Sequence, residues 1–334
     1  MARRVVDLRS QRPLLDIASH GRAAAGHGRG LSSGEIAHAT RTARGAPEVM
    51  IKVSGGARSP RGVSAHLDYI GREGRGDIET DDGQVLVGDG VAQSLLNDWD
   101  LDLTQRRRSA HGMATQRTRP PKLVHNLVFS MPAGTPPKKL REAVRTFANE
   151  RFGLEHRYAM ALHTDQGHPH VHVVVKAVSE DGQRLNIRKA TLRDWRQDFA
   201  RCLRNVGIEA NATERAVRGA ITPRKLDGIH RAARRGASTH MRERTERVAN
   251  ELARGALRVE AGKDKLRSTR DAVVAGWTRL AAALDATGRT SDASAIRQFV
   301  ARMPPPLTEK EWIANQLARL AYKHRAQERP ELTR

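Results

Sequence analysis

A hairpin predicted over residues 158–176 constrains the fold of this chain more than any other part of the sequence. It reads YAMALHT, then a polar turn, then HVHVVVK, which is typical of two strands joined by a short loop. Side chains alternate along a strand, so Val171 and Val173 should face a core. His170 and His172 then project together from the opposite face. The sequence therefore predicts a sheet with one apolar face and one face that carries histidines.

The histidines of this hairpin predict a metal site. His170 and His172 would lie about 7 Å apart at Cα on one face, and antiparallel pairing would bring His163 alongside them. Three neutral imidazoles can hold one divalent cation and leave positions open for a substrate, which is a catalytic rather than a structural arrangement. The alternative is a histidine-rich turn whose imidazoles face solvent.

The turn itself contains His168 and Asp165, and two roles are open for each of them. His168 lies two residues before His170, but Pro169 redirects the chain between them, so we expect His168 to face a substrate or the loop. Asp165 is either an outer carboxylate, which orients an imidazole or accepts a proton, or a simple turn former.

Apolar patterns elsewhere predict elements in the order strand, helix, strand, helix, strand pair, helix. They are expected at residues 48–53, 63–70, 125–130, 136–152, 158–176 and 191–206. Thr135 should cap the second helix and Thr191 should open a capping box for the third. Trp195, Phe199 and Cys202 share one helical face and should lie in the core. The order predicts an α+β fold with a central, mainly antiparallel sheet flanked by helices.

Composition divides the chain into three regions. Residues 1–47 are rich in Gly, Ala, Ser and Arg without an apolar period, which predicts a mobile basic arm. Residues 48–222 contain the strands and helices above and should form one folded domain. Within it, 77–121 is first acidic and then basic, and we expect an insertion or flap with a helix at 91–99. Residues 223–334 predict a basic helical appendage with a thin core.

The charge balance narrows the class of partner. The chain has 59 Lys and Arg against 37 Asp and Glu, a formal net charge of +22, which favours nucleic acid first and an anionic membrane surface second. A single cysteine excludes an internal disulfide and a cysteine-based zinc site. Without a signal peptide or a membrane-length apolar run, we expect a soluble, cytoplasmic protein. A cation in so basic a chain indicates a phosphodiester as the reacting group.

Three segments, in order, resemble the motifs of plasmid relaxases of the MobP class, HUH-type nucleases that include the T-DNA border endonucleases. HLDYIGREG resembles the first motif, with Tyr69 at the nucleophile position; by pattern alone Tyr69 is an ordinary half-exposed aromatic. HNLVFSMPAGT is similar to the second, with Ser130 at the DNA-contacting serine, and HTDQGHPHVHVVV to the third. IEANATERAVRG resembles the stretch that closes the nuclease domain, so the likeness covers about residues 49–221.

The resemblance implies a DNA-nicking transesterase that is specific for one site and strand. Tyr69 would cut the transfer origin of a conjugative or mobilisable element, leaving a 5′-phosphotyrosine adduct that can be religated. His163, His170 and His172 would hold the divalent cation, with Asp165 assisting. Members are usually described with Mg²⁺ or Mn²⁺, whereas three imidazoles by themselves favour later transition metals.

The resemblance also implies the partners. They are single-stranded DNA at the transfer origin, relaxosome accessory proteins and a type IV coupling protein, with passage to a recipient cell while bound to DNA. Arg58, Arg61, Arg72 and Arg75 around the tyrosine, with the arginines of 106–119, are expected strand contacts. The alternative for each is a solvated surface charge.

Two other functions stay open at this point. A rolling-circle replication initiator has the same chemistry but usually places its tyrosine after the histidines, whereas Tyr69 precedes them. A non-catalytic DNA-binding accessory protein of mobilisation is the alternative from a different functional class.

Overall fold

The computed structural model divides into two compact units, one of which is Gly45–Ala212 and the other Met1–Arg44 with Thr213–Arg334. The residues that the structure describes are 32–101, 120–165, 167–219, 236, 238–255 and 257–327.

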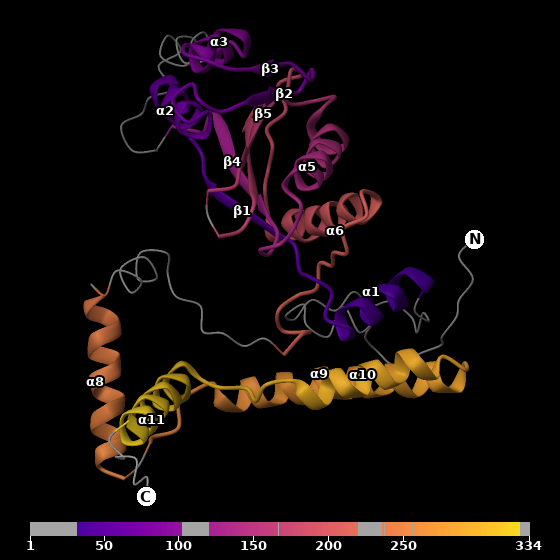
Figure 1. Ribbon diagram of the computed structural model, residues 1–334, viewed down its shortest axis with the longest axis vertical. Coiled ribbons are helices and arrows are strands. Elements are labelled where there is room, and N and C mark those ends of the chain that lie inside the picture. Colours follow the sequence, from indigo (N-terminus) through magenta and orange to yellow (C-terminus); the bar gives the residue numbers. More distant parts are fainter. Residues whose placement is uncertain are drawn as a thin grey trace, which may run out of the picture. The chain divides into compact units, whose positions relative to one another are not determined.

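The Gly45–Ala212 unit is built on a six-stranded sheet of order β1-β4-β6-β5-β2-β3 (Figure 1). Its strands are β1 (Met50–Gly55), β2 (Ile78–Thr80), β3 (Val85–Leu86), β4 (Val124–Ser130), β5 (Tyr158–His163) and β6 (His170–Lys176). All neighbouring strands run antiparallel. The predicted α+β class with an antiparallel sheet is confirmed, and so is the hairpin of β5 and β6.

Four helices described in this unit flank the sheet: α2 (Pro60–Ile70), α3 (Val91–Asp98), α5 (Pro137–Phe152) and α6 (Lys189–Asn205). Figure 1 shows α5 and α6 on one side of the sheet and α2 on the other. The two faces of the sheet are therefore covered by different helices.

The face under α5 and α6, called here the apolar face, carries the main core. Phe129 of β4 lies 5.0 Å from Phe147 of α5 and 5.1 Å from Phe199 of α6, measured between ring centroids. Alternate residues of β6, including Val171 and Val173, are completely buried against the same cluster. Trp195, Phe199 and Cys202 belong to this cluster as predicted.

The opposite face, called here the histidine face, is covered by α2 and α3. Leu67 and Ile70 of α2 pack with Leu95 of α3 over Ala159 and Val174 of the sheet. The apolar packing extends as far as Ala161, which pairs with His172, and the positions of His163, His170 and His172 beyond it on this face are polar.

The region 77–121 differs from the insertion predicted for it. β2 pairs with β5 and so extends the central sheet, and Glu79 of β2 is buried in an ion pair with Arg145 of α5. Strands of two or three residues are too short to show alternation, which explains why the sequence pattern missed them. The predicted helix is present as α3, and the basic block 105–119 lies outside the described residues.

Both predicted threonine caps are wrong. α5 follows Pro136, and the hydroxyl of Thr135 donates to the carbonyl of Pro132 at 2.8 Å instead. α6 begins at Lys189, so Thr191 already lies inside its first turn and accepts from the amide of Arg188 at 3.3 Å. Thr135 therefore bonds only to the preceding loop, whereas Thr191 is the third residue of α6 and takes part in a capping box with the N-cap residue Arg188 instead of being the N-cap itself.

The second unit is helical where it is described. Its helices are α1 (Ser33–Ala43), α8 (Thr239–Ala253), α9 (Lys263–Ala286), α10 (Thr290–Arg302) and α11 (Glu309–Gln327). Trp277, Leu280 and Leu284 of α9 form one small core with α10, and Val248 of α8 packs on Ile313 of α11 in another. None of the helices among the described residues has the length and apolar character to cross a membrane.

Helix α1 differs from the mobile arm predicted for residues 1–47. Ser32 and Glu35 form a capping box, and Ile36, Ala39 and Ala43 pack into the core of α9 and α10. The stripe contains one large apolar residue, which is too little for a sequence pattern to mark a helix. Residues 1–31 of the predicted arm lie outside the described part of the chain.

Candidate functional site

The register of three strands brings the site together. His163 of β5 lies directly opposite His170 of β6, and Ser130 of β4 lies opposite His170 on its other side. Residues paired directly across antiparallel strands project from the same face. Ser130, His170 and His163 therefore form one row, and His172 stands two residues along β6 on the same face.

The three imidazoles form a compact, buried cluster. Their ring centroids are 4.7 Å apart for His163 and His172, 5.1 Å for His170 and His172, and 5.4 Å for His163 and His170. One nitrogen from each ring lies within 4.8 Å of the others, and each residue is at most 7% exposed. This arrangement could hold one metal ion.

Backbone carbonyls orient two of the rings. Nε2 of His163 lies 2.8 Å from the carbonyl of Ile70, and Nδ1 of His170 lies 3.3 Å from the carbonyl of His168. A ring nitrogen that faces a carbonyl must carry the proton, so the other nitrogen keeps its lone pair. His172 has no such partner among the described residues. Each ring thus has a nitrogen free to bind a cation.

The electrostatics of the cluster favour neutral imidazoles. Burial, with repulsion from His163 and His170, lowers the pKa of His172 to about 3. Burial also lowers the pKa of His170. Both rings are therefore uncharged at neutral pH, which is the state that binds metal.

Helix α2 presents Tyr69 to this cluster. Ser59 caps the helix and Pro60 occupies its first position, while Val63, Leu67 and Ile70 are buried. Tyr69 lies on another side of the helix and is 55% exposed. The helix ends at Gly71, where an added Cβ would lie 2.9 Å from the side chain of Ile78, so a larger residue would require that side chain to shift.

The phenol ring of Tyr69 lies beside the histidines. Its centroid is 5.8 Å from that of His172 and 6.2 Å from that of His163, both edge to face. Ile70, the next residue, holds His163 through its carbonyl. The structure thus brings together the tyrosine and the imidazoles, which are far apart in the sequence.

His66 belongs to this constellation and was missed by the sequence interpretation. Its ring stacks on Tyr69 at 5.9 Å and meets His172 edge on at 6.2 Å. Its Nε2 is buried and has no hydrogen-bond partner in the described part of the chain, and burial lowers its pKa. The available signal was its position three residues before Tyr69, because such residues are neighbours on a helix.

Asp165 contacts an arginine rather than a histidine. Its carboxylate lies 2.7 Å from the guanidinium of Arg72, and this hydrogen bond lowers the pKa of Asp165. Arg72 and Glu73 both have left-handed backbone angles, φ 52° and 55°, which cost about 1–3 kcal/mol each for residues other than glycine. A strained turn directly after the helix of Tyr69 thus carries the partner of Asp165.

The other predicted DNA-contacting residues are not part of the histidine cluster. Arg58 donates to the carbonyl of Pro120, and Arg75 donates to the carbonyl of Arg72 and approaches Glu73. The ring of His168 lies 6.0 Å from that of His170, but His168 is not part of the cluster that could hold a metal.

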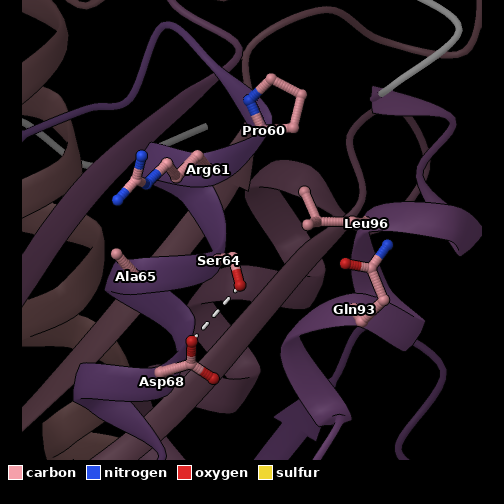
Figure 2. A pocket seen from close by; sticks show the side chains of 7 residues that line it. All are labelled: Pro60, Arg61, Ser64, Ala65, Asp68, Gln93 and Leu96. Atoms are coloured by element: carbon pink, nitrogen blue, oxygen red, sulfur yellow. Dashed lines mark hydrogen bonds between the residues drawn. The ribbon is translucent and has the colours of Figure 1, made fainter.

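A hollow of about 450 Å³ lies between α2 and α3. Figure 2 shows Ser64 bonded to Asp68 along α2, with Gln93 and Leu96 facing them from α3. Arg61, one of the predicted strand contacts, also lines this hollow. One wall of the hollow is therefore formed by α2, the helix that also carries Tyr69.

The region around the histidines matches the model of a known protein family. Residues 82–208 match the model of the family described as relaxase, MobA/VirD2-like, nuclease domain. The matched segment includes Ser130 and the three clustered histidines and begins after Tyr69.

Curated relatives give the same family. The T-DNA border endonuclease VirD2 of Rhizobium radiobacter is 26% identical over 186 residues, which are 52% of this chain and 43% of that protein. The T-DNA border endonuclease VirD2 of Agrobacterium fabrum (strain C58) is 27% identical over 194 residues, 54% of this chain and 42% of that protein. The chain thus spans about two fifths of the relatives it matches. The part that carries the histidine cluster therefore matches the relaxase nuclease domain of MobA/VirD2-like proteins, a likeness that supports a relaxase of the MobP type.

Proposed function

We propose that this chain is a relaxase that nicks one DNA strand at the transfer origin of a conjugative or mobilisable element and can reseal it. The observation that carries the proposal is the position of Tyr69, half exposed and edge on to two buried imidazoles, those of His163 and His172. A phenol beside a group of potential metal ligands is suited to attack a phosphodiester.

The proposed step is a transesterification. The phenol oxygen of Tyr69 forms a bond to the scissile phosphorus while the bond from phosphorus to the 3′ oxygen breaks. The phenol proton passes to a base, and the 3′ oxygen takes up a proton, so the products are a free 3′-hydroxyl and a 5′-phosphotyrosine. One phosphodiester replaces another, so resealing needs no external energy source.

His163, His170 and His172 are the proposed holders of a divalent cation. When bound, the cation would neutralise charge that develops on the phosphate oxygens. Mg²⁺ or Mn²⁺ is proposed from the family, and the all-imidazole set also suits later transition metals. Ser130, in the same row as His170, is proposed to contact the strand, and Asp165 to keep Arg72 beside the site.

The proposed setting is the bacterial cytoplasm. The partners would be single-stranded DNA of the origin, relaxosome accessory proteins and a type IV coupling protein, with passage to a recipient cell attached to the DNA. The position of Tyr69 before the histidines favours a relaxase over a rolling-circle initiator, and its closeness to them favours catalysis over an accessory role.

Covalent capture tests this function. The protein is incubated with labelled single strands that cover candidate origins and with manganese, and complexes that survive denaturation are separated on a gel. We expect an adduct with the wild type and none with Tyr69→Phe. Tyr322→Phe is the matched control, because Tyr322 is also exposed, at 76%. An adduct that persists in Tyr69→Phe would overturn the assignment.

A further inference from the structure

A second cavity, of about 640 Å³, lies in the nuclease-bearing unit away from the histidine cluster. Its lining includes His125, which lies five residues before Ser130 on β4. Five residues of strand span about 17 Å, and an odd spacing places the two side chains on opposite faces. The cavity is therefore separate from the site of Tyr69.

The lining of this cavity is strongly basic. Lys122, Arg184, Arg188 and Lys189 contribute to it, and no Asp or Glu does. Lys122 donates to the carbonyl of Gly55 at 2.9 Å, and Arg184 donates to the carbonyl of Lys122 at 3.1 Å. Within the described ranges no carboxylate pairs with these four cations, so their positive charge is available to an anion.

The start of α6 adds to this positive potential. Lys189 and Leu192 of its first turn line the cavity together with the preceding Arg188. The first turn of a helix has unsatisfied amide groups and a partial positive charge, which favour phosphate.

His125 supplies a buried polar group to the same cavity. Both of its ring nitrogens are shielded from solvent and make no hydrogen bond of normal geometry to described residues, although the Leu185 backbone is near. Burial, with the charge of Lys122, lowers its pKa to about 4, so the ring is neutral at pH 7. A buried polar group without a partner is costly unless a ligand or water supplies one.

The remaining wall is apolar and could receive a base. Val53, Leu185, Ile187 and Leu192 face the cavity. Val53 lies on β1, which ends the sheet on this side. A cluster of cations beside an apolar wall matches a nucleotide, which has a charged phosphate and a flat, weakly polar base.

We propose that this cavity binds one nucleotide of the single DNA strand at a distance from the nick, with its phosphate on Arg184 and Arg188 and its base against Leu185 and Leu192. The inference rests on the proposed function, because it assumes a DNA substrate. The cavity would anchor the strand and thereby contribute to the choice of origin.

Binding by charge-matched variants tests the proposal. Tyr69→Phe protein, which should not cleave, is compared with the same protein carrying Arg184→Gln/Arg188→Gln. Fluorescence anisotropy with a labelled oligonucleotide should show about a tenfold loss of affinity. The logarithmic salt slope should fall by about 0.7, since the two arginines share one phosphate and each phosphate contact to a single strand contributes about 0.7.

The control pair is Lys138→Gln/Arg141→Gln on α5, which removes the same charge outside the cavity. It should leave the salt slope unchanged. Equal losses in the two pairs would overturn the proposal, because they would show a general charge effect. Thermal unfolding of both pairs should match that of the parent protein.

Photo-cross-linking locates the contact and separates the two hypotheses. With halogenated pyrimidines at successive positions of the oligonucleotide, a cross-link should map to residues 185–192 at one position only. Cross-linking there without any Tyr69 adduct would refute the proposed nicking while supporting the cavity. An adduct without such a cross-link would refute the nucleotide site in the cavity and leave the proposed nicking in place. A free nucleoside monophosphate that binds as tightly as the oligonucleotide would show a small-molecule site and contradict the strand contact.

Discussion

The two faces of the central sheet differ in polarity and in what packs on them, although the same strands form both. On the apolar face every alternate residue of β6 is a buried valine packed against aromatic rings of α5 and α6. On the histidine face the same strand begins with His170 and His172, and the ring of His172 lies between those of Tyr69 and His170, 5.8 Å from the first and 5.1 Å from the second. Both faces contribute apolar packing, and the histidine face in addition shields a group of polar side chains from water.

This difference has an energetic consequence. Apolar burial contributes about 25 cal/mol per Å² removed from water, so the aromatic and aliphatic cluster of the apolar face favours folding. On the histidine face, His172 and Oδ1 of Asn126 are buried without hydrogen-bond partners among the described residues, and each such group costs about 1–3 kcal/mol. The apolar clusters of the two faces together offset this cost.

The largest expected effect comes from the apolar face. Phe147→Ala should lower the free energy of unfolding by about 3–5 kcal/mol, because the ring is fully buried among Phe129, Trp195 and Phe199. Urea unfolding followed by circular dichroism measures the change. If the loss is below about 1 kcal/mol, this face does not supply the main stability of the unit.

The next effect belongs to the histidine face alone. His170→Ala/His172→Ala should weaken Mn²⁺ binding by at least about a hundredfold, equivalent to about 2.7 kcal/mol, while the unfolding free energy changes little. Isothermal titration calorimetry measures the affinity. His168→Ala is the matched control and should bind as the wild type does, since its ring lies outside the cluster. Equal affinity in the double variant would refute the ligand set.

Acid should weaken the histidine face before it affects the apolar core. The pKa of His172 falls to about 3 in the folded chain from an ordinary value near 6.5, so the unfolded chain binds more protons between these values. Stability is therefore complete above pH 6.5 and declines as the pH falls towards 3. The midpoint temperature of unfolding, measured in steps from pH 7 to pH 4.5, should decline less in His172→Leu than in the wild type. Part of the decline should remain in this variant, because the pKa of His125 is also lowered in the folded chain. An unchanged slope in the variant would contradict the buried, neutral state of His172.

The smallest effect concerns the turn after α2. Arg72→Gln removes the ion pair with Asp165, and because both groups are partly exposed the unfolding free energy should change by less than about 1 kcal/mol. Adduct formation should slow by about tenfold, equivalent to about 1.4 kcal/mol in the barrier, if the pair fixes the turn beside Tyr69. Asp165→Asn should match Arg72→Gln. A normal rate in both would show that the pair has no influence on the site.

The sequence could predict what alternation and helical periodicity encode. The hairpin, its valine and histidine faces and the helix of Tyr69 follow from spacings of two residues and of three or four. The family resemblance pointed to Tyr69 and Ser130, which no periodicity marks as functional.

Other features depend on contacts between distant residues. β2 joins the sheet through pairing with β5, and α1 is fixed by packing on α9 and α10, and neither interaction leaves a local pattern. The closeness of His66 to His172 likewise depends on how α2 lies over β6. The predicted N-cap residues were wrong because several nearby polar residues could cap each helix, and only the geometry of the turn decides among them.

Mass spectrometry of the DNA-linked protein tests the central claim most directly. After digestion with nuclease and trypsin, the account predicts a nucleotide attached to the peptide of residues 62–72, in which Tyr69 is the one tyrosine. A nucleotide found on a peptide that contains Tyr158 or Tyr322 instead, or no modified peptide with an origin that the protein demonstrably cuts, would contradict it.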